Sequence, residues 1–286
     1  MPPWLQEQEA GLVINKSLTD KVEAAKTILL ELGSVVVAFS AGVDSTYLLA
    51  LAVETLGPDR VVAAMGISPS LAQRERAQGH ALANRLGATL REIETGEMED
   101  PAYAANPANR CFFCKQDLFG RLNALKAELG FGAVVSGANA DDLGDFRPGM
   151  QAGLEMGVRS PLLEANLTKE EIRQASKDLD LPTWDKPAMA CLASRIPYGE
   201  AITPQLLARV ERSESALKDL GLRQVRVRDH GLVARIEVPV GDLEQVLQHR
   251  EAITARLKNL GYRYVTLDLQ GFRSGSMNEG MQGLES

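Results

Sequence analysis

The first half of the chain alternates between extended, β-branched runs and helix-like segments, and this alternation constrains the fold more than any other feature. Four runs are typical of strands: SVVVAFS, RVVAAMGIS, ATLREIET and GAVVSGAN. β-Branched residues fit strands, and parallel strands buried on both faces are largely apolar. The segments between them carry apolar residues three and four positions apart, as amphipathic helices do. We therefore predict an α/β protein whose parallel sheet has helices on both faces.

The pattern changes in the last third of the chain. The segment LTKEEIRQASKDLDLP predicts a helix with Thr168 as N-cap and Glu171 completing a capping box. A segment rich in proline and small residues follows, and long irregular segments are usually functional. After it we predict a helix, two strands, one helix over 241–261 and a final strand. The predicted domains are 1–200, with the parallel sheet, and 201–286, a smaller α/β domain for substrate binding or oligomerisation.

The loop SAGVDS, from Ser40 to Ser45, joins the first predicted strand to the next helix. There, successive backbone N–H groups converge at a helix N-terminus, where unpaired amides and the helix dipole favour an anion. Small residues let phosphate oxygens approach the backbone. The alternative is a tight strand–helix turn with Ser45 as N-cap. The lysine of the GxxxxGK[ST] phosphate loop is missing, so the loop is of another kind.

SAGVDS resembles the SGGxDS loop of the ATP pyrophosphatase (PP-loop) superfamily, whose members cleave ATP between the α and β phosphates to adenylate a substrate. Ala41 replaces the usual second glycine, which keeps the amide and adds one methyl group. The resemblance implies an adenine nucleotide α-hydrolase-like fold. It also implies Mg²⁺ at Asp44, Asp141 and Asp142, the last two at the carboxyl edge of the sheet; a solvated turn is the alternative. The implied ATP-binding residues are Ser40, Ala41, Gly42, Val43, Asp44, Ser45, Gly137 and Asn139.

Four further stretches narrow the resemblance: NPANRCFFCKQDLF, SGANADDLGDFRPG, CLASRIPYGEAIT and GFRSGSMNEG. Together they are similar to the LarE family of sulfur transferases, over nearly the whole chain. In that family, carboxylates of pyridinium-3,5-biscarboxylic acid mononucleotide are activated by AMP transfer and converted to thiocarboxylates. The product becomes the nickel-pincer nucleotide. The resemblance implies an ATP-dependent sulfurtransferase that forms AMP and pyrophosphate, and a homo-oligomer, which we expect to be a trimer-based hexamer.

Three cysteines make an odd number, which gives no closed disulfide framework. The N-terminal residues lack a signal-peptide pattern, and no apolar run is long enough to span a bilayer. We therefore expect a cytoplasmic protein with no membrane partner.

Cys111 and Cys114 form a CxxC at the start of a helix predicted over Lys115–Leu129, where thiol pKa values are lowered. Alone, a CxxC fits half a zinc site, a redox pair or part of an iron–sulfur ligand set.

Cys191 lies in the irregular segment, among polar neighbours, where a core-filling thiol would be out of place. The LarE resemblance implies two mechanisms. In one, Cys191 attacks the adenylate, forms a thioester and gives up its sulfur to become dehydroalanine. In the other, Cys111, Cys114 and Cys191 hold a 4Fe–4S cluster whose open iron carries sulfide from a sulfur donor. We favour the cluster form because the chain has these three cysteines; the expected catalytic residues are Asp44, Cys111, Cys114 and Cys191.

Arg226 and Arg228 alternate along QVRVR and therefore share one face of a strand. Two neighbouring guanidinium groups suit a phosphate, although a solvated strand face paired with Asp229 or Glu237 is the ordinary interpretation. With the LarE resemblance we predict the mononucleotide phosphate site here. The predicted substrate-binding residues are Ser194, Arg195, Glu214, Arg226, Arg228 and Arg273.

Other functions share parts of this pattern. A tRNA thiolation enzyme would have the same loop and cysteines, but it would need a basic surface. The formal net charge of −7 disfavours it, so we expect no nucleic-acid partner. An ammonia-dependent synthetase of the NAD or GMP type would not need the cysteines. A non-enzymatic interpretation is a nucleotide-binding protein in which the cysteines bind zinc.

Overall fold

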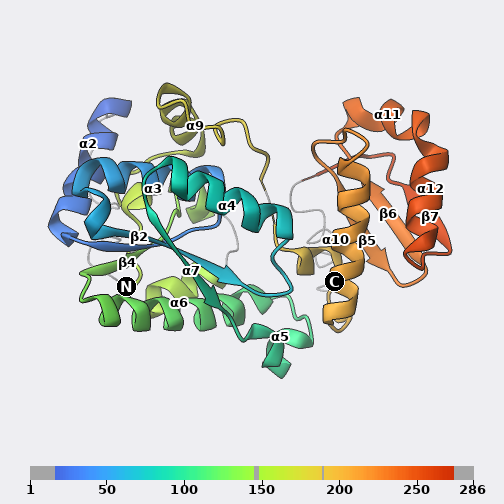
Figure 1. The fold of residues 1–286 in the computed structure, drawn as a ribbon, viewed down its shortest axis with the longest axis horizontal. Coiled ribbons are helices and arrows are strands. Elements are labelled where there is room, and N and C mark those ends of the chain that lie inside the picture. Colours follow the sequence, from blue (N-terminus) through green and yellow to red (C-terminus); the bar gives the residue numbers. More distant parts are fainter. Residues whose placement is uncertain (1–16, 145–147, 189, 274–286) are drawn as a thin grey trace. The chain divides into compact units, whose positions relative to one another are not determined.

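The structure, a computed structural model, describes residues 17–144, 148–188 and 190–273. The chain forms two compact units (Figure 1). Of the described residues, the first unit contains 17–67, 73–95, 111–144 and 148–188, and the second contains 68–72, 96–110 and 190–273. The domain boundary near residue 200 stays a prediction.

The first unit is built on a four-stranded sheet in the order β3-β2-β1-β4. Its strands are β1 (Val35–Ala38), β2 (Val61–Ile67), β3 (Thr89–Glu94) and β4 (Ala133–Val135). All neighbouring strands run parallel; Val35, for example, lies opposite both Val61 and Ala133. The predicted α/β fold with a parallel sheet is confirmed. Because the strands are parallel, the residues that follow β1 and β4 lie at the same edge of the sheet.

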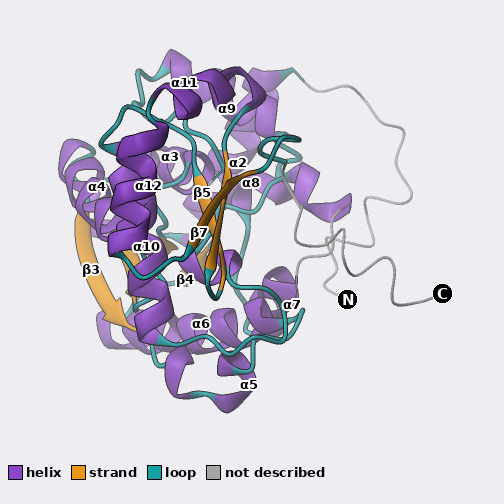
Figure 2. Ribbon diagram, turned by 90° about the vertical axis from the view of Figure 1, so that its right-hand side faces the viewer, coloured by secondary structure: helices purple, strands orange, loops and turns teal. Residues whose placement is uncertain are grey.

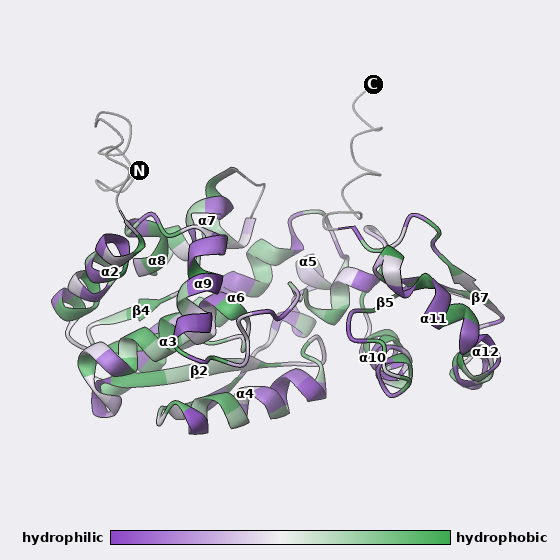
Figure 3. Ribbon diagram, turned by 90° about the horizontal axis from the view of Figure 1, so that it is seen from above, coloured by the Kyte–Doolittle hydropathy of each residue, from purple (hydrophilic) through white to green (hydrophobic). Residues whose placement is uncertain are grey.

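Helices cover both faces of this sheet. The helical segments are α2 (Leu18–Leu32), α3 (Val43–Leu56), η2 (Pro58–Arg60), α4 (Gln73–Arg85), α6 (Arg110–Leu129), η4 (Ala140–Gly144), α7 (Pro148–Glu155), α8 (Pro161–Glu164) and α9 (Lys169–Asp178). Figure 1 shows α3 and α4 on one face and α6 on the other. Phe119 and Leu122 of α6 pack with Val36 and Val62 in a buried cluster, and Figure 3 shows the hydrophobic colouring of β2 and β4. No helix in the described ranges is long and apolar enough to cross a membrane.

The second unit contains a three-stranded sheet in the order β5-β6-β7. Its elements are η3 (Glu97–Glu99), α5 (Pro101–Ala104), η5 (Leu192–Arg195), α10 (Pro204–Lys218), β5 (Arg226–His230), β6 (Val233–Glu237), η6 (Val240–Asp242), α11 (Leu243–Gln248), α12 (Arg250–Asn259) and β7 (Tyr264–Leu267). Strand β6 pairs antiparallel with β5 and parallel with β7. Helices α10 and α12 lie beside this sheet (Figure 2), where Leu217 and Leu257 pack on Val227 and Ile236.

Local signals predict some helix limits and miss others. The capping box of α9 is confirmed, because Thr168 and Glu171 bond to each other's backbone N–H groups. Helix α6 begins at Arg110, before the predicted Lys115, so both cysteines of the CxxC lie inside it. The single helix predicted over 241–261 is wrong. His249 leaves the regular helical conformation (φ −94°, ψ 9°), so it ends α11 and begins α12.

Candidate active site

The SAGVDS loop ends at helix α3, which begins at Val43 with Gly42 as N-cap. The alternative with Ser45 as N-cap is therefore wrong: Ser45 lies in the first turn, where its hydroxyl accepts a hydrogen bond from the Ser40 N–H (3.2 Å). No side chain caps the helix, and its first backbone hydrogen bond runs from the Thr46 N–H to the Gly42 carbonyl. The N–H groups before Thr46 are thus available to an anion, as a phosphate loop requires.

Ala41 gives this loop its bend. Its φ of 55° is left-handed, a conformation that costs an L-residue about 1–2 kcal/mol, and its side chain is fully buried. The Ala41 carbonyl accepts a hydrogen bond from Lys186 Nζ (2.9 Å). The same ammonium group bonds to Glu75 (2.6 Å) and Gln78 (2.7 Å) of α4. Lys186 therefore joins the loop to α4.

Asp44 is the acidic residue of the loop. Its carboxylate forms an ion pair with Lys169, the first residue of α9, and accepts a hydrogen bond from the Asn139 side chain (3.4 Å). Gly137 permits this approach, since a Cβ there would lie 3.0 Å from the Ser45 nitrogen and 3.2 Å from Asp44 Cβ. The structure thus brings the predicted residues after β1 and β4 together.

The other two predicted magnesium ligands already make hydrogen bonds. The Asp142 carboxylate accepts one from the Asn139 N–H (3.0 Å), and the Asp141 carboxylate accepts one from the Lys169 N–H (2.6 Å). Across the described ranges, no group of three or more His, Cys, Asp and Glu side chains is arranged to hold a metal ion. A magnesium ion would therefore depend on phosphate or water oxygens as well as Asp44, and the predicted ligand set stays a prediction.

The three cysteines lie in described segments and none is in a disulfide. Cys111 is exposed and Cys114 is half-buried; they lie one turn apart, at the N-terminal end of α6. Cys191 is exposed and directly precedes η5. Its exposure contradicts a core-packing role and leaves the thiol accessible for chemistry. Cys191 belongs to the second unit, so a shared ligand set of all three thiols stays a prediction.

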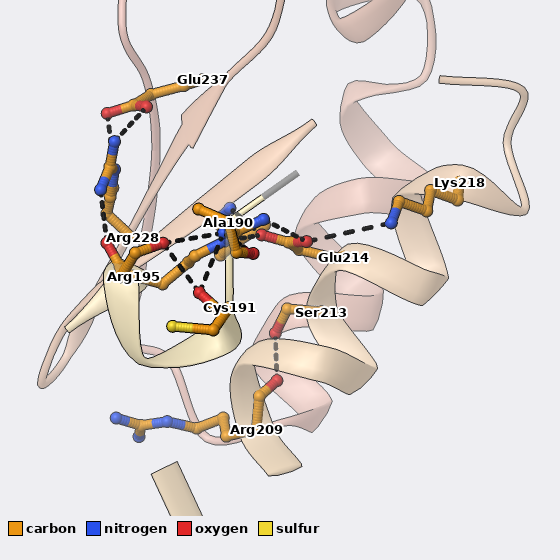
Figure 4. A network of polar contacts seen from close by, with 11 residues as sticks. Ala190, Cys191, Arg195, Arg209, Ser213, Glu214, Lys218, Arg228 and Glu237 are labelled. Carbon is orange, nitrogen blue, oxygen red and sulfur yellow. Dashed lines mark hydrogen bonds and ion pairs between the residues drawn. The ribbon is translucent and has the colours of Figure 1, made fainter. Parts of the chain in front are cut away.

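Arg195 fixes the backbone around Cys191 (Figure 4). Its guanidinium group pairs with Glu214 at 2.7 and 3.1 Å, and both side chains are almost fully buried. A further nitrogen donates to the carbonyl groups of Ala190 (2.8 Å) and Cys191 (3.2 Å). The Ser194 hydroxyl also donates to the Cys191 carbonyl (2.8 Å). The buried ion pair therefore supports the turn that presents the thiol.

Arg226 and Arg228 share a face of β5 but differ in charge compensation. Arg228 pairs with Glu237 at 2.9 and 3.0 Å and donates to the Ser194 carbonyl (2.6 Å). This face is buried rather than solvated, with Arg228 3% and Arg226 9% exposed. Among the described residues, Arg226 has no carboxylate partner; its guanidinium lies over the Phe272 ring, 4.3 Å from the centroid.

Within the described part of the chain, Arg226 is consequently a buried cation without an ion pair. Its burial, and then the neighbouring charges of Arg195 and Arg228, lower the pKa of Arg226 to about 10. An anion is the natural partner for such a group. Arg273, the last described residue, donates to the Gly271 carbonyl (3.5 Å); the rest of the GFRSGSMNEG stretch and residues 145–147 of SGANADDLGDFRPG lie outside the described residues.

Comparison with known proteins identifies the family. No protein-family model matches the chain. A pyridinium-3,5-bisthiocarboxylic acid mononucleotide synthase of Lactiplantibacillus plantarum is 37% identical over 263 residues, which are 92% of this chain and 95% of that protein. The chain belongs to the LarE family. An uncharacterized Synechocystis protein is 45% identical over 263 residues (91% of this chain, 98% of its own). One from Methanocaldococcus jannaschii is 31% identical over 169 residues (59% and 66%).

Sequence reasoning misses two lysines of this LarE-family chain. Lys186 lies in the irregular segment, whose composition indicated a functional role without singling out this residue. Lys169 carries no signal at all, because lysine is common on helix surfaces and its partner Asp44 is 125 residues away.

Proposed function

We propose that the protein is an ATP-dependent sulfurtransferase acting on pyridinium-3,5-biscarboxylic acid mononucleotide. It adenylates the carboxylates of this substrate and converts them to thiocarboxylates, with AMP and pyrophosphate as the other products, for nickel-pincer nucleotide biosynthesis. The observation that carries the proposal is the 37% identity, over 92% of the chain, to a relative named as the bisthiocarboxylate mononucleotide synthase.

We also propose that the protein is a cytoplasmic homo-oligomer, a trimer-based hexamer. Size-exclusion chromatography with light scattering tests this oligomeric state.

The loop of the first unit supports ATP binding. The uncapped N–H groups at the start of α3 can donate to phosphate oxygens, and Lys169 places a cation beside Asp44. A bound Mg²⁺ would offset phosphate charge, with Asp44 as a protein ligand. These groups favour attack of a substrate carboxylate on the α-phosphate: a carboxylate oxygen forms a bond to phosphorus, and pyrophosphate leaves with the electron pair of the broken bond. The carboxylate then carries AMP as a leaving group.

The second unit supports binding of the mononucleotide phosphate. Arg226 forms no ion pair with any residue that the structure describes, so we assign it the direct contact with the phosphate. Arg195 and Arg228 are held by Glu214 and Glu237. We therefore assign these two arginines, with Ser194, to shaping the site.

For the sulfur, we propose the form with a 4Fe–4S cluster at Cys111, Cys114 and Cys191. The proposal is supported by the chemistry of the side chains: thiols are the usual ligands of such clusters, none of these three is in a disulfide, and all are at least partly exposed. A bound cluster would supply sulfide on its open iron. In the alternative, the Cys191 thiolate displaces AMP to form a thioester; loss of the Cα proton and cleavage of the Cβ–S bond then leave dehydroalanine and the thiocarboxylate.

Cysteine variants distinguish the two forms after anaerobic purification. The cluster form predicts bound iron and labile sulfide, and Cys111→Ala should lose both, together with thiocarboxylate formation. If Cys111→Ala instead makes one equivalent of product while Cys191→Ala makes none, the cluster form is wrong.

Pyrophosphate release tests the adenylation step separately. It should require both ATP and the mononucleotide, and Asp44→Asn should reduce it at least tenfold. Release stimulated by tRNA but not by the mononucleotide would overturn the proposed substrate. Bound zinc without any ATP turnover would overturn the enzymatic proposal.

A further inference from the structure

Lys186 is held in place at both its backbone and its side chain. Arg173 of α9 donates to the carbonyl groups of Trp184 (2.6 Å) and Lys186 (2.9 Å), which fixes the turn that carries the lysine. The Lys186 side chain is only 11% exposed. Its ammonium group has three N–H donors, and three acceptors surround it: the Ala41 carbonyl, Glu75 and Gln78. Lys186 is therefore a rigid donor with every hydrogen satisfied.

The bond to Ala41 determines the direction of the next N–H group. The Ala41–Gly42 peptide bond is trans, so its C=O and N–H groups point in opposite directions. Because the carbonyl points to Lys186, the Gly42 N–H points away from it. Among the described residues, this N–H has no hydrogen-bond acceptor, and Gly42 directly precedes the uncapped start of α3. The orientation of this peptide therefore decides whether the Gly42 N–H joins the donors available to a phosphate.

The conformation of Ala41 works against this orientation. An alanine at φ 55° is strained, whereas a glycine adopts a left-handed conformation freely. Without the lysine, relaxation of Ala41 out of the left-handed region would change its ψ as well as its φ, and the change in ψ would turn the Ala41–Gly42 peptide and withdraw the Gly42 N–H. The bond from Lys186 opposes this relaxation.

We infer that Lys186 is a positioning residue that holds the Ala41–Gly42 peptide in the orientation that binds an ATP phosphate. The inference rests on the proposed function for the identity of the ligand. If Lys186 served only to attach α4, a different result would be expected. The effect of removing Lys186 on ATP binding would then be the same whichever residue occupies position 41.

A double-mutant cycle tests the inference by calorimetric titration with ATP and Mg²⁺, which requires no sulfur transfer. We expect Lys186→Met to raise the Kd for ATP about tenfold in the natural background. In the Ala41→Gly background the same change should raise it about threefold or less, because glycine does not drive the peptide to relax. Equal increases in both backgrounds, or an increase below about twofold with Ala41 present, would overturn the inference.

Two controls keep the test decisive. Lys26→Met removes a lysine that pairs with Glu54 on the surface and should leave the Kd unchanged. If Lys186→Met does not fold, Lys186→Met with Glu75→Gln avoids stranding a carboxylate and serves in the same cycle. A wild-type protein that binds ATP but makes no thiocarboxylate would overturn the proposed function and not this inference; absence of ATP binding would overturn both.

Discussion

Lys169 and Asp44 form an ion pair at the point where we propose that the phosphates of ATP bind. Lys169→Ala removes the cation, and we expect it to raise the KM for ATP about tenfold, since a hydrogen bond to a charged group contributes about 1.5–3 kcal/mol. Pyrophosphate release measured against ATP concentration gives this value. Lys177→Ala is the matched control: it lies on the same helix, over the Trp184 ring, and should change the KM less than twofold. Equal effects of the two changes would contradict the role of Lys169.

The SAGVDS loop could be predicted because its signal is local: a buried strand, small residues and a helix follow one another. The two lysines could not, because their contacts join segments far apart in the chain. Lys169 bonds to a residue 125 positions away, and Lys186 to one 145 positions away. Likewise, alternation along QVRVR places two arginines on one face, but only the packed structure shows that Glu237 compensates Arg228 and that Arg226 has no such partner among the residues described.

The different ion pairing of the two arginines of β5 leads to a prediction about the stability of the protein. Arg228→Met would remove two charged hydrogen bonds from buried Glu237 and leave it with Arg235 (3.0 Å) as its cation, so we expect the free energy of unfolding to fall by about 2 kcal/mol. Arg226→Met removes a buried charge that has no carboxylate partner in the described ranges, and it should lower this free energy by less than about 1 kcal/mol. Denaturant unfolding measures both. Inorganic phosphate should raise the Tm of the wild type more than that of Arg226→Met, in which the SAGVDS loop is the anion site that remains; an equal rise in both would contradict phosphate binding at Arg226.

Glu92 of strand β3 forms hydrogen bonds with Arg76 and His80 of helix α4, and this link depends on the ionisation of the Glu92 carboxyl group. Hydrogen bonds from Arg76 and then His80 lower the pKa of Glu92 from 4.5 to about 2. Because folding favours the ionised form, this contribution to stability is complete above pH 4.5 and is lost as the pH falls towards 2. We expect Glu92→Gln to reduce the loss of stability over this range, by a small amount because the pair is partly exposed. Acid titrations of both proteins measure it, and identical curves would contradict the assignment.

Helix limits with local signals were predictable and those without were not. The capping box of α9 can be predicted from Thr168 and Glu171, three positions apart, and both side chain–backbone hydrogen bonds of the box are present in the structure. The break at His249 involves neither proline nor glycine, and the apolar spacing continues through it. Tertiary packing of α12, through Ile253 and Leu257 in the core of the second unit, determines the direction that the chain takes there.

The two units divide the chemistry that we propose. The first contains the loop, Asp44 and the CxxC, and the second contains Cys191 and the arginines. Identity to the synthase extends over 92% of the chain and so includes segments of both units. The formal net charge of −7 remains an argument against RNA as the substrate.

The most direct test of this account is anaerobic incubation with ATP, Mg²⁺, sulfide as the sulfur donor and pyridinium-3,5-biscarboxylic acid mononucleotide, followed by mass spectrometry of the small molecules and of the protein. We predict a product in which a carboxylate oxygen is replaced by sulfur, one AMP for each replacement, and an intact Cys191. Dehydroalanine at position 191 would be consistent with the proposed sulfur transfer but would contradict the proposed cluster mechanism. An unchanged mononucleotide, in a protein that binds ATP, would contradict the central claim.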